Sequence, residues 1–537
     1  MNYIKKVEQL LPTLTIEEKV GQLFVLAFAG EDNDYALDLI KNYHVGGFYI
    51  TDDNARSLAD AKKLSTTLQQ QASLRACDVP LLLAVDQEGA WGILTKETDL
   101  GPGNLALGSA NDMAATETMY QVFAQQMQAI GYNTLLSPCA DVNSNPDNPI
   151  IGQRSFGECP SQVSVHVGAA VKGIIKTGSL ACAKHFPGHG NTETDSHRTL
   201  PVVNKSLIEL MSDDLLPFKQ AIASDVSLIM TAHINYPKVD DNFPATLSKI
   251  ILTDILKKQL GFNGLIITDS MNMGAMRKYY SPSEAAILAI KAGAHLIMLS
   301  EEHYENEATP YKQIQQETIQ GVINAVKSGD ISQQQIDETL KHVLSFKYQH
   351  TAMYKSSPIL TKEACKKVSE NLADKAIKVL KNDLSLFPLS GQKFVLSYAA
   401  NPIHYEKLVN SRGIGPNDPC PASEVFTAQL TAQNADFSVI SYQQMTDILT
   451  RSSNDNFDVP LVLLTEDYPL PGEDFDQVNQ FKRIKSIQKK FNDKLLILAF
   501  RSDYELAKLS DVHTYICAYS SRAVSAKSLA KLLVSRL

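Results

Sequence analysis

The chain has 537 residues, of which 44% are hydrophobic and 20% are charged, and its formal net charge is −9. This length is too great for one hydrophobic core and predicts two domains with linking helices. The acidic balance, without a long basic run, argues against nucleic acid as the main partner. No stretch approaches the roughly 20 apolar residues that span a membrane.

The N-terminus and the cysteines bear on the cellular compartment. Residues 1–8 contain no apolar segment of the length found in a signal peptide. The seven cysteines are scattered, and none forms a Cys-x-x-Cys pair. This usage is typical of small core residues in a reducing compartment. We therefore expect a cytoplasmic protein.

Eight short apolar runs alternate with helical patterns between residues 20 and 300. The runs cover residues 21–26, 45–50, 81–86, 134–138, 181–184, 228–233, 265–269 and 296–300. Most are continuously apolar, as strands buried on both faces are. Helical segments fit between them, for example at residues 114–130 and 247–260. The pattern predicts a (β/α)8 TIM-type barrel, with a doubly wound open sheet as the alternative.

A second α/β region follows the barrel. Residues 310–350 are typical of two amphipathic helices separated by a turn at residues 327–330. Apolar runs at residues 394–398, 437–440, 461–465, 495–500 and 514–519 then predict a C-terminal α/β sandwich domain. We expect the barrel over residues 1–308, a helical linker over 309–370 and the sandwich over 371–537.

Polar residues follow the C-terminal ends of the predicted barrel strands. They are Asp86, Arg154, Lys184, His185, His233 and Asp269. The carboxyl ends of barrel strands converge on one face, so these residues are expected to surround one mouth. Carboxylates accept hydrogen bonds from sugar hydroxyls, and Arg and Lys donate to sugar oxygens. The set therefore favours a small polyhydroxylated ligand.

The segment from Lys184 to His197 combines a cation, histidines and carboxylates with turn-forming Gly and Pro. Asp195 and His197 lie two residues apart, so the carboxylate is able to hold one ring nitrogen and orient the other. That arrangement is typical of a positioned general acid/base. A polar surface loop or an adventitious metal cluster is the alternative, and no metal or cofactor is expected.

Asp269 directly follows four apolar residues, at the tip of a predicted strand. A carboxylate held there is able to attack an anomeric carbon, while a second group protonates the leaving oxygen. His197, whose pKa is ordinarily near neutral, is a candidate for that proton donor. The alternative for Asp269 is a helix N-cap.

These motifs resemble the family 3 glycoside hydrolases and, among them, the bacterial β-N-acetylglucosaminidases. The resemblance rests on residues 184–197, 266–271, 154–157 and 86–89. It implies that Asp269 is the nucleophile and that His197 is the acid/base with Asp195 as its partner. It also implies sugar binding by Asp86, Arg154, Lys184 and His185, with His233 lining the same pocket.

The resemblance further implies removal of a terminal, non-reducing β-linked N-acetylglucosamine with retention, in cell-wall or chitooligosaccharide turnover. The expected partner is an N-acetylglucosamine-containing oligosaccharide, either a muropeptide or a chitooligosaccharide. No nucleic acid or membrane partner is expected, and the sequence leaves the oligomeric state open. A phosphorylase or transglycosylase of the same fold is the main alternative. A non-catalytic sugar-binding protein, a β-glucosidase and a metal-dependent hydrolase are weaker ones.

The sequence departs from the family pattern at three places. After residues 86–89 the family continues with Gly and Arg, whereas this chain has Ala90, Trp91 and Gly92. Trp91 is a candidate either for stacking on a sugar ring or for core packing. His295 stands where the family often has Asp, and Asn191 replaces a common Asp in the loop.

Overall fold

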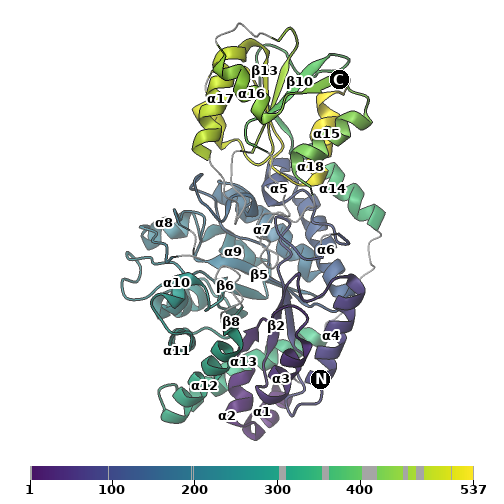
Figure 1. Cartoon of the computed structure of the whole chain (residues 1–537). Helices are drawn as coiled ribbons and strands as arrows, with labels where there is room; N and C mark the ends of the chain where they lie inside the picture. Colours follow the sequence, from purple (N-terminus) through teal and green to yellow (C-terminus); the bar gives the residue numbers. More distant parts are fainter. Residues whose placement is uncertain are drawn as a thin grey trace.

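The computed structural model describes residues 3–94, 96–194, 196, 199–300, 310–352, 362–401, 420–451, 457–466, 477–509 and 511–535. Figure 1 shows a barrel built from the N-terminal part of the chain and a smaller sheet domain, built from the C-terminal part, above it. No described helix is long and apolar enough to cross a membrane. All seven cysteines are free thiols, and five of them are buried.

Eight parallel strands form the barrel, and each lies beside its neighbour in the chain, with β8 next to β1. They are β1 (Phe24–Leu26), β2 (Gly47–Ile50), β3 (Leu82–Val85), β4 (Thr134–Leu135), β5 (Leu180–Phe186), β6 (Leu228–Thr231), β7 (Leu265–Ile267) and β8 (Ile297–Leu299). A bridge between Ile267 and Leu296 joins β7 to β8. The strand order never reverses, as it does in a doubly wound sheet, so the prediction of a barrel is confirmed.

Helices surround the strands. They are α1 (Tyr3–Leu10), α2 (Ile16–Gly21), α3 (Asn33–Asn42), α4 (Leu58–Ala72), α5 (Asn104–Ala110), α6 (Met113–Ala129), α7 (Pro160–Ile175), α8 (Leu207–Ser212), α9 (Leu216–Ala223), a π-helical segment (Ile250–Gln259), α10 (Gly274–Arg277) and α11 (Pro282–Ala292). The helices expected at residues 114–130 and 247–260 therefore form at nearly those positions. Every residue of the eight strands is buried, which explains their continuously apolar sequences.

Most barrel strands are shorter than the apolar runs that predict them, and β1 and β4 are shorter by three residues each. The first run begins at Gly21, but that residue ends α2, where a Cβ would lie 2.0 Å from the Tyr43 carbonyl oxygen. Gly21 is therefore a close-packing residue and not part of β1. The fourth strand ends at Leu135, and Pro138, in the predicted run, has no N–H to donate to a neighbouring strand.

Three helices connect the barrel to the second domain, namely α12 (Tyr311–Ser328), α13 (Gln333–Ala352) and α14 (Lys362–Ala376). The two predicted amphipathic helices are confirmed as α12 and α13, and Gly329 ends the first with a φ of 83°. The Ser109 hydroxyl of α5 donates to the Ala376 carbonyl at 2.7 Å, so the end of α14 is fastened to the barrel. The boundaries at residues 308 and 370 stay predictions, and residues 301–309 and 353–361 lie outside the described residues.

The second domain is a six-stranded sheet in the order β11-β10-β12-β13-β14-β9. Its strands are β9 (Lys378–Asn382), β10 (Phe394–Tyr398), β11 (Phe437–Val439), β12 (Leu461–Thr465), β13 (Leu495–Ala499) and β14 (Thr514–Cys517). One hydrophobic cluster joins the sheet to α15 (Ala422–Ala432) and α18 (Ala523–Leu533), and another joins it to α16 (Tyr442–Thr450) and α17 (Gln477–Phe491). The predicted α/β sandwich is confirmed, with helices on both faces of the sheet.

Strand β9 was not predicted. It pairs antiparallel with β14 at the edge of the sheet, and none of its residues is fully buried. Its sequence, Lys-Val-Leu-Lys-Asn, has lysines at two of five positions. Lysines are a common device for protecting an edge strand, and they hide the apolar signal by which the other strands are recognised.

Candidate active site

The predicted sugar-binding residues meet in one buried network at the C-terminal ends of the strands. Lys184, in β5, places its Nζ 2.5 Å from Asp86 Oδ1 and 2.7 Å from Glu88 Oε1. Asp86 and Glu88 both follow β3, so one segment of the barrel supplies the two carboxylates and β5 supplies the ammonium group. Lys184 is only 3% exposed. The ammonium group is therefore fixed by ion pairs and not by water.

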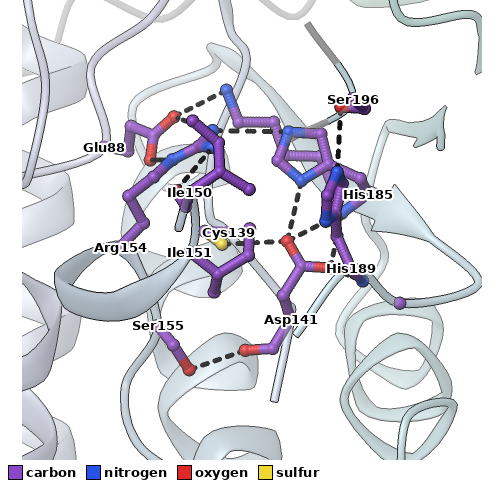
Figure 2. Close-up of polar contacts among 12 residues, drawn as sticks. Glu88, Cys139, Asp141, Ile150, Ile151, Arg154, Ser155, His185, His189 and Ser196 are labelled. Carbon is purple, nitrogen blue, oxygen red and sulfur yellow. Dashed lines mark hydrogen bonds and ion pairs between the residues drawn. The ribbon is translucent and has the colours of Figure 1, made fainter. Parts of the chain in front are cut away.

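Arg154 lies on the other side of Glu88. It ends a short 3-10 turn, Gly152–Arg154, in the long loop after β4. Its Nε and Nη2 atoms donate to the two Glu88 oxygens at 2.9 and 3.0 Å, a bidentate pair. Figure 2 shows Arg154 between Glu88 and His185, whose Nε2 lies 3.3 Å from Arg154 Nη2.

Electrostatics keeps this network ionised. Burial alone would raise the pKa of Glu88, but the charges of Arg154 and Lys184 outweigh it and lower the pKa to about 2. Burial likewise opposes the charge on Lys184, and Asp86 and Glu88 nonetheless raise its pKa above the ordinary value. The two cations and two carboxylates balance one another, so they present charge-assisted hydrogen-bonding groups without a net buried charge.

The protonation of His185 follows from its partners. Arg154 has only donors, so the His185 Nε2 that faces it must accept, and the ring proton is on Nδ1. Nδ1 donates to Asp141 Oδ2 at 2.7 Å. Asp141 also accepts from the backbone N–H of His189 at 2.6 Å. Burial raises the pKa of Asp141, but His185 and His189 outweigh that effect and hold it well below its ordinary range.

Asp195 and His197, the predicted acid/base pair, lie outside the described residues. Ser196 between them is described and buried. Its hydroxyl lies 2.9 Å from His189 Nε2, and the other His189 ring nitrogen lies 2.9 Å from the Thr192 hydroxyl (Figure 2 shows the Ser196 contact). The His189 ring therefore links Thr192 to Ser196 within the segment of residues 184–197.

Asp269 lies two residues beyond the end of β7 and is half-buried. Its Oδ1 accepts from the Ser270 N–H at 2.7 Å. The next helix, α10, begins at Gly274 with Met273 as its cap, so Asp269 is not a helix N-cap. Burial and then the charges of Asp86 and Asp269 hold the pKa of the Tyr49 hydroxyl far above its ordinary value. Both carboxylates therefore act on the same hydroxyl, which donates to Asp86 Oδ2 at 2.6 Å.

His233 follows β6, the strand that pairs with β7. Its Nε2 donates to the Ser270 carbonyl at 2.9 Å, and its Nδ1 lies 2.8 Å from the Thr246 hydroxyl. A carbonyl only accepts, so the ring proton is on Nε2. His233 thus fixes the backbone next to Asp269.

Glu88, Asp141 and His189 belong to the site but were not among the predicted site residues. Glu88 and Asp141 lie in the segments that follow β3 and β4, and His189 lies between Lys184 and His197. The same signal, a polar residue at a strand end, was therefore available for each. What the sequence did not reveal is which of these residues pair with one another.

One group of side chains in the described part of the chain has the composition of a metal site. Cys139, Asp141 and His185 place their ligand atoms within 4.8 Å of one another. Cys139 Sγ donates to Asp141 Oδ2 at 3.1 Å, and burial keeps the pKa of this thiol well above its ordinary value. Cys139 and His185 both hydrogen-bond Asp141 Oδ2, so we describe the three residues as part of the hydrogen-bond network.

The departures from the family pattern have structural explanations. Trp91 is 4% exposed, and the Arg154 guanidinium lies 3.7 Å from the centre of its ring, so Trp91 packs under Arg154. His295 Nδ1 accepts a hydrogen bond from the backbone N–H of Ile266 in β7 at 2.9 Å. A histidine therefore makes the structural hydrogen bond at this position. Asn191 donates to the Ser144 hydroxyl at 3.0 Å.

Comparison with known proteins identifies the family. The Glycosyl hydrolase family 3 N terminal domain matches residues 15–346. The chain belongs to this family. The match includes α12 and most of α13, so these helices are part of the region that the family shares.

Relatives of this chain carry glycosidase names. It is 31% identical over 368 residues to beta-hexosaminidase A of Pseudoalteromonas piscicida, covering 64% of this chain and 61% of that protein. It is 29% identical over 343 residues to a beta-N-acetylglucosaminidase/beta-glucosidase of Cellulomonas fimi, covering 62% and 57%. The chain therefore spans less than two thirds of either relative.

A solved structure matches over both domains. The family 3 beta-N-acetylglucosaminidase from Paenibacillus sp. str. FPU-7 superposes with a TM-score of 0.83 at 29% identity, covering 97% of each chain. Both the barrel and the second domain are therefore shared with this structure. The family predicted from residues 86–89, 154–157, 184–197 and 266–271 is confirmed.

Proposed function

We propose that the protein is a retaining exo-β-N-acetylglucosaminidase, which removes terminal β-linked N-acetylglucosamine from the non-reducing end of an oligosaccharide. The observation that carries this proposal is the buried network of Asp86, Glu88, Lys184 and Arg154, together with the half-buried Asp269, whose charge acts on the same Tyr49 hydroxyl as that of Asp86. Supporting it are the beta-hexosaminidase and beta-N-acetylglucosaminidase names of the relatives.

In this proposal the network binds the terminal sugar. Asp86 accepts from sugar hydroxyls, and Lys184 and Arg154 donate to sugar oxygens. His185 has both ring nitrogens engaged, by Asp141 and Arg154, so it orders the wall of the pocket. His233 holds the Ser270 carbonyl and so supports the strand end at Asp269. Because these groups are already paired in the free protein, little reorganisation is needed when sugar binds.

The proposed reaction has two steps. The Asp269 carboxylate attacks the anomeric carbon, the glycosidic C–O bond breaks, and the leaving oxygen takes a proton from His197, which Asp195 orients. Water then attacks the anomeric carbon while His197 removes its proton, and the bond to Asp269 breaks to return the carboxylate. Two inversions give overall retention.

We further propose that the substrate is a chitooligosaccharide or a muropeptide fragment and that the enzyme acts in the cytoplasm. Here no Arg follows residues 86–89, and Trp91 packs under Arg154. A neutral chitooligosaccharide is therefore favoured over an acidic muramic-type partner, which would benefit from a cation there.

The test is the initial rate on an aryl β-N-acetylglucosaminide, with and without phosphate, for the wild type, Asp269→Ala and Asp254→Ala. Asp254 is an exposed carboxylate paired with Lys258 on the protein surface. We expect Asp269→Ala to lower kcat by more than about 1,000-fold, since a covalent nucleophile is lost. Asp254→Ala should leave kcat unchanged.

Two outcomes would contradict the proposal. Strong stimulation by phosphate, with sugar 1-phosphate as product, would make the protein a phosphorylase. An Asp269→Ala variant that keeps the wild-type rate would remove Asp269 from the chemistry.

A further inference from the structure

One side chain of the second domain reaches the loop that carries Arg154. Tyr504 begins a 3-10 segment, Tyr504–Lys508, that follows β13. Its hydroxyl accepts a hydrogen bond from Asn143 Nδ2 at 2.6 Å, across 361 positions of the chain. Ser521 of the same domain lies 3.5 Å from Gln153 in that loop, at the limit of a hydrogen bond.

Asn143 holds the turn that ends in Arg154. Its side-chain Oδ1 accepts from the Gly152 N–H at 3.2 Å, and its backbone N–H donates to the Gly157 carbonyl at 3.0 Å. The two bonds enclose the segment from 152 to 157. Because Asn143 donates to Tyr504 through the other end of the same amide, the orientation of this amide depends on the second domain.

The same loop also contacts the loop that precedes Asp195. The Asn145 N–H donates to the Gly190 carbonyl at 3.2 Å, and its side chain donates to the Thr192 carbonyl at 3.1 Å. Asn148 donates to the His189 carbonyl at 2.8 Å. The loop fastened by Tyr504 is therefore in contact with both the sugar-binding network and the segment of residues 184–197, which we call the histidine loop.

We infer that Tyr504 is a positioning residue for sugar binding, which acts through Asn143 on Arg154. Tyr504 also hydrogen-bonds Glu158, which opposes the rise that burial causes in the pKa of this carboxyl group. The hydroxyl thus accepts from one loop residue and donates to another, and a phenylalanine would satisfy neither. The second domain contributes no group that contacts the sugar in this inference. Instead, the second domain fixes the geometry of Arg154, which contacts the sugar.

The inference rests on the proposed function, and its test uses the full chain with Tyr504→Phe, Asn143→Ala and the double variant. Tyr442→Phe is the matched control, because the Tyr442 ring stacks on Arg483 within the second domain. We expect Tyr504→Phe to raise KM for the aryl β-N-acetylglucosaminide about 3- to 10-fold, with kcat within about twofold. Tyr442→Phe should leave both constants unchanged.

The double variant and fluorescence complete the test. If Tyr504 acts through Asn143, the double variant has the same KM as Asn143→Ala alone. Trp91 is the only tryptophan in the chain and lies against the Arg154 guanidinium, so its emission should shift in Tyr504→Phe and not in Tyr442→Phe. This readout needs no turnover, and it therefore separates failure of the inference from failure of the proposed function.

An unchanged KM in Tyr504→Phe, or additive effects in the double variant, would overturn the inference. So would unchanged Trp91 emission in Tyr504→Phe. A lower unfolding temperature without a change in KM or emission would give Tyr504 a merely structural role.

Discussion

Arg154 shows how single side chains are fixed in this site. Glu88 holds the edge of its guanidinium with two hydrogen bonds, His185 accepts a third, and Trp91 covers one face. All four residues are buried. A cation that is desolvated over an indole ring gains about 2 kcal/mol or more from the ring quadrupole. Trp91 therefore holds the guanidinium in a fixed position.

Substitution of Trp91 tests this position. Trp91→Leu removes the π face, whereas Trp91→Phe keeps an aromatic ring beneath the guanidinium. We expect Trp91→Leu to raise KM about 3- to 30-fold and Trp91→Phe to raise it less than about threefold, with kcat little changed in either. Steady-state kinetics on the aryl substrate makes the comparison. Equal KM values in the two variants would show that filling the space, and not the ring, is what matters.

At this scale the sequence predicted which residues gather but not how they pair. Asp86, Arg154, Lys184 and His185, expected around one mouth, lie in one buried network, and their role in sugar binding stays a prediction. The pairing of Lys184 with both Asp86 and Glu88 depends on side-chain directions that spacing does not encode. Trp91 was left between two interpretations because a lone aromatic residue in a loop fits both.

At the scale of elements, the loop after β4 and the histidine loop pack backbone to backbone. A Cβ on Gly190 would lie 1.7 Å from the Val142 carbonyl oxygen. This contact leaves no room for any side chain at Gly190. The close approach also allows Asn145 to reach the Gly190 carbonyl. The two loops therefore behave as one packed unit.

Gly190→Ala should displace the histidine loop from the loop after β4. We expect kcat/KM to fall at least about 100-fold, since a shift of about 1 Å at a catalytic group has that effect. Gly329→Ala is the control, because Gly329 has a φ of 83° and open space around it at the α12–α13 turn. It should lose about 1 kcal/mol of stability without a change in kcat/KM. Comparable kinetics for Gly190→Ala and wild type would show that the loops move apart without consequence.

Elements were predictable where burial on both faces gave continuous apolar runs. All eight barrel strands and β10, β12, β13 and β14 of the second sheet form where such runs occur, whereas β11 forms where it was predicted although it is mostly exposed. The errors lie where another constraint acts, as with Gly21, which belongs to a helix that packs closely on the Tyr43 carbonyl. The edge strand Lys378–Asn382 lacks the apolar signal altogether.

At the scale of the whole molecule, the fold class and the family followed from the sequence, but the contact between the domains did not. No periodicity or motif relates Asn143 to Tyr504, because their contact depends on how two separately patterned domains dock.

The single tryptophan gives a probe of the barrel alone, since Trp91 lies in that domain. Unfolding of the barrel is therefore separable from that of the second domain.

The acid sensitivity of the barrel is expected to depend on His166. This residue of α7 is buried, its Nδ1 lies 2.9 Å from the Thr116 hydroxyl of α6, and its Nε2 meets no partner among the described residues. Burial lowers the pKa of His166 to about 4, from an ordinary 6.5. The unfolded chain therefore takes up a proton below pH 6.5 while the folded barrel does not, so stability falls as the pH drops from 6.5 towards 4.

Between pH 7.5 and pH 5.0, this difference should remove about 2 kcal/mol from the free energy of unfolding of the barrel. His166→Gln cannot titrate and should lose about 2 kcal/mol less than the wild type over the same interval. Urea unfolding followed by Trp91 emission at both pH values measures the loss. The other buried histidines, such as His295, titrate alike in both proteins and cancel in the comparison. Parallel losses in the two proteins would mean that His166 is already protonated in the folded barrel at pH 5.0.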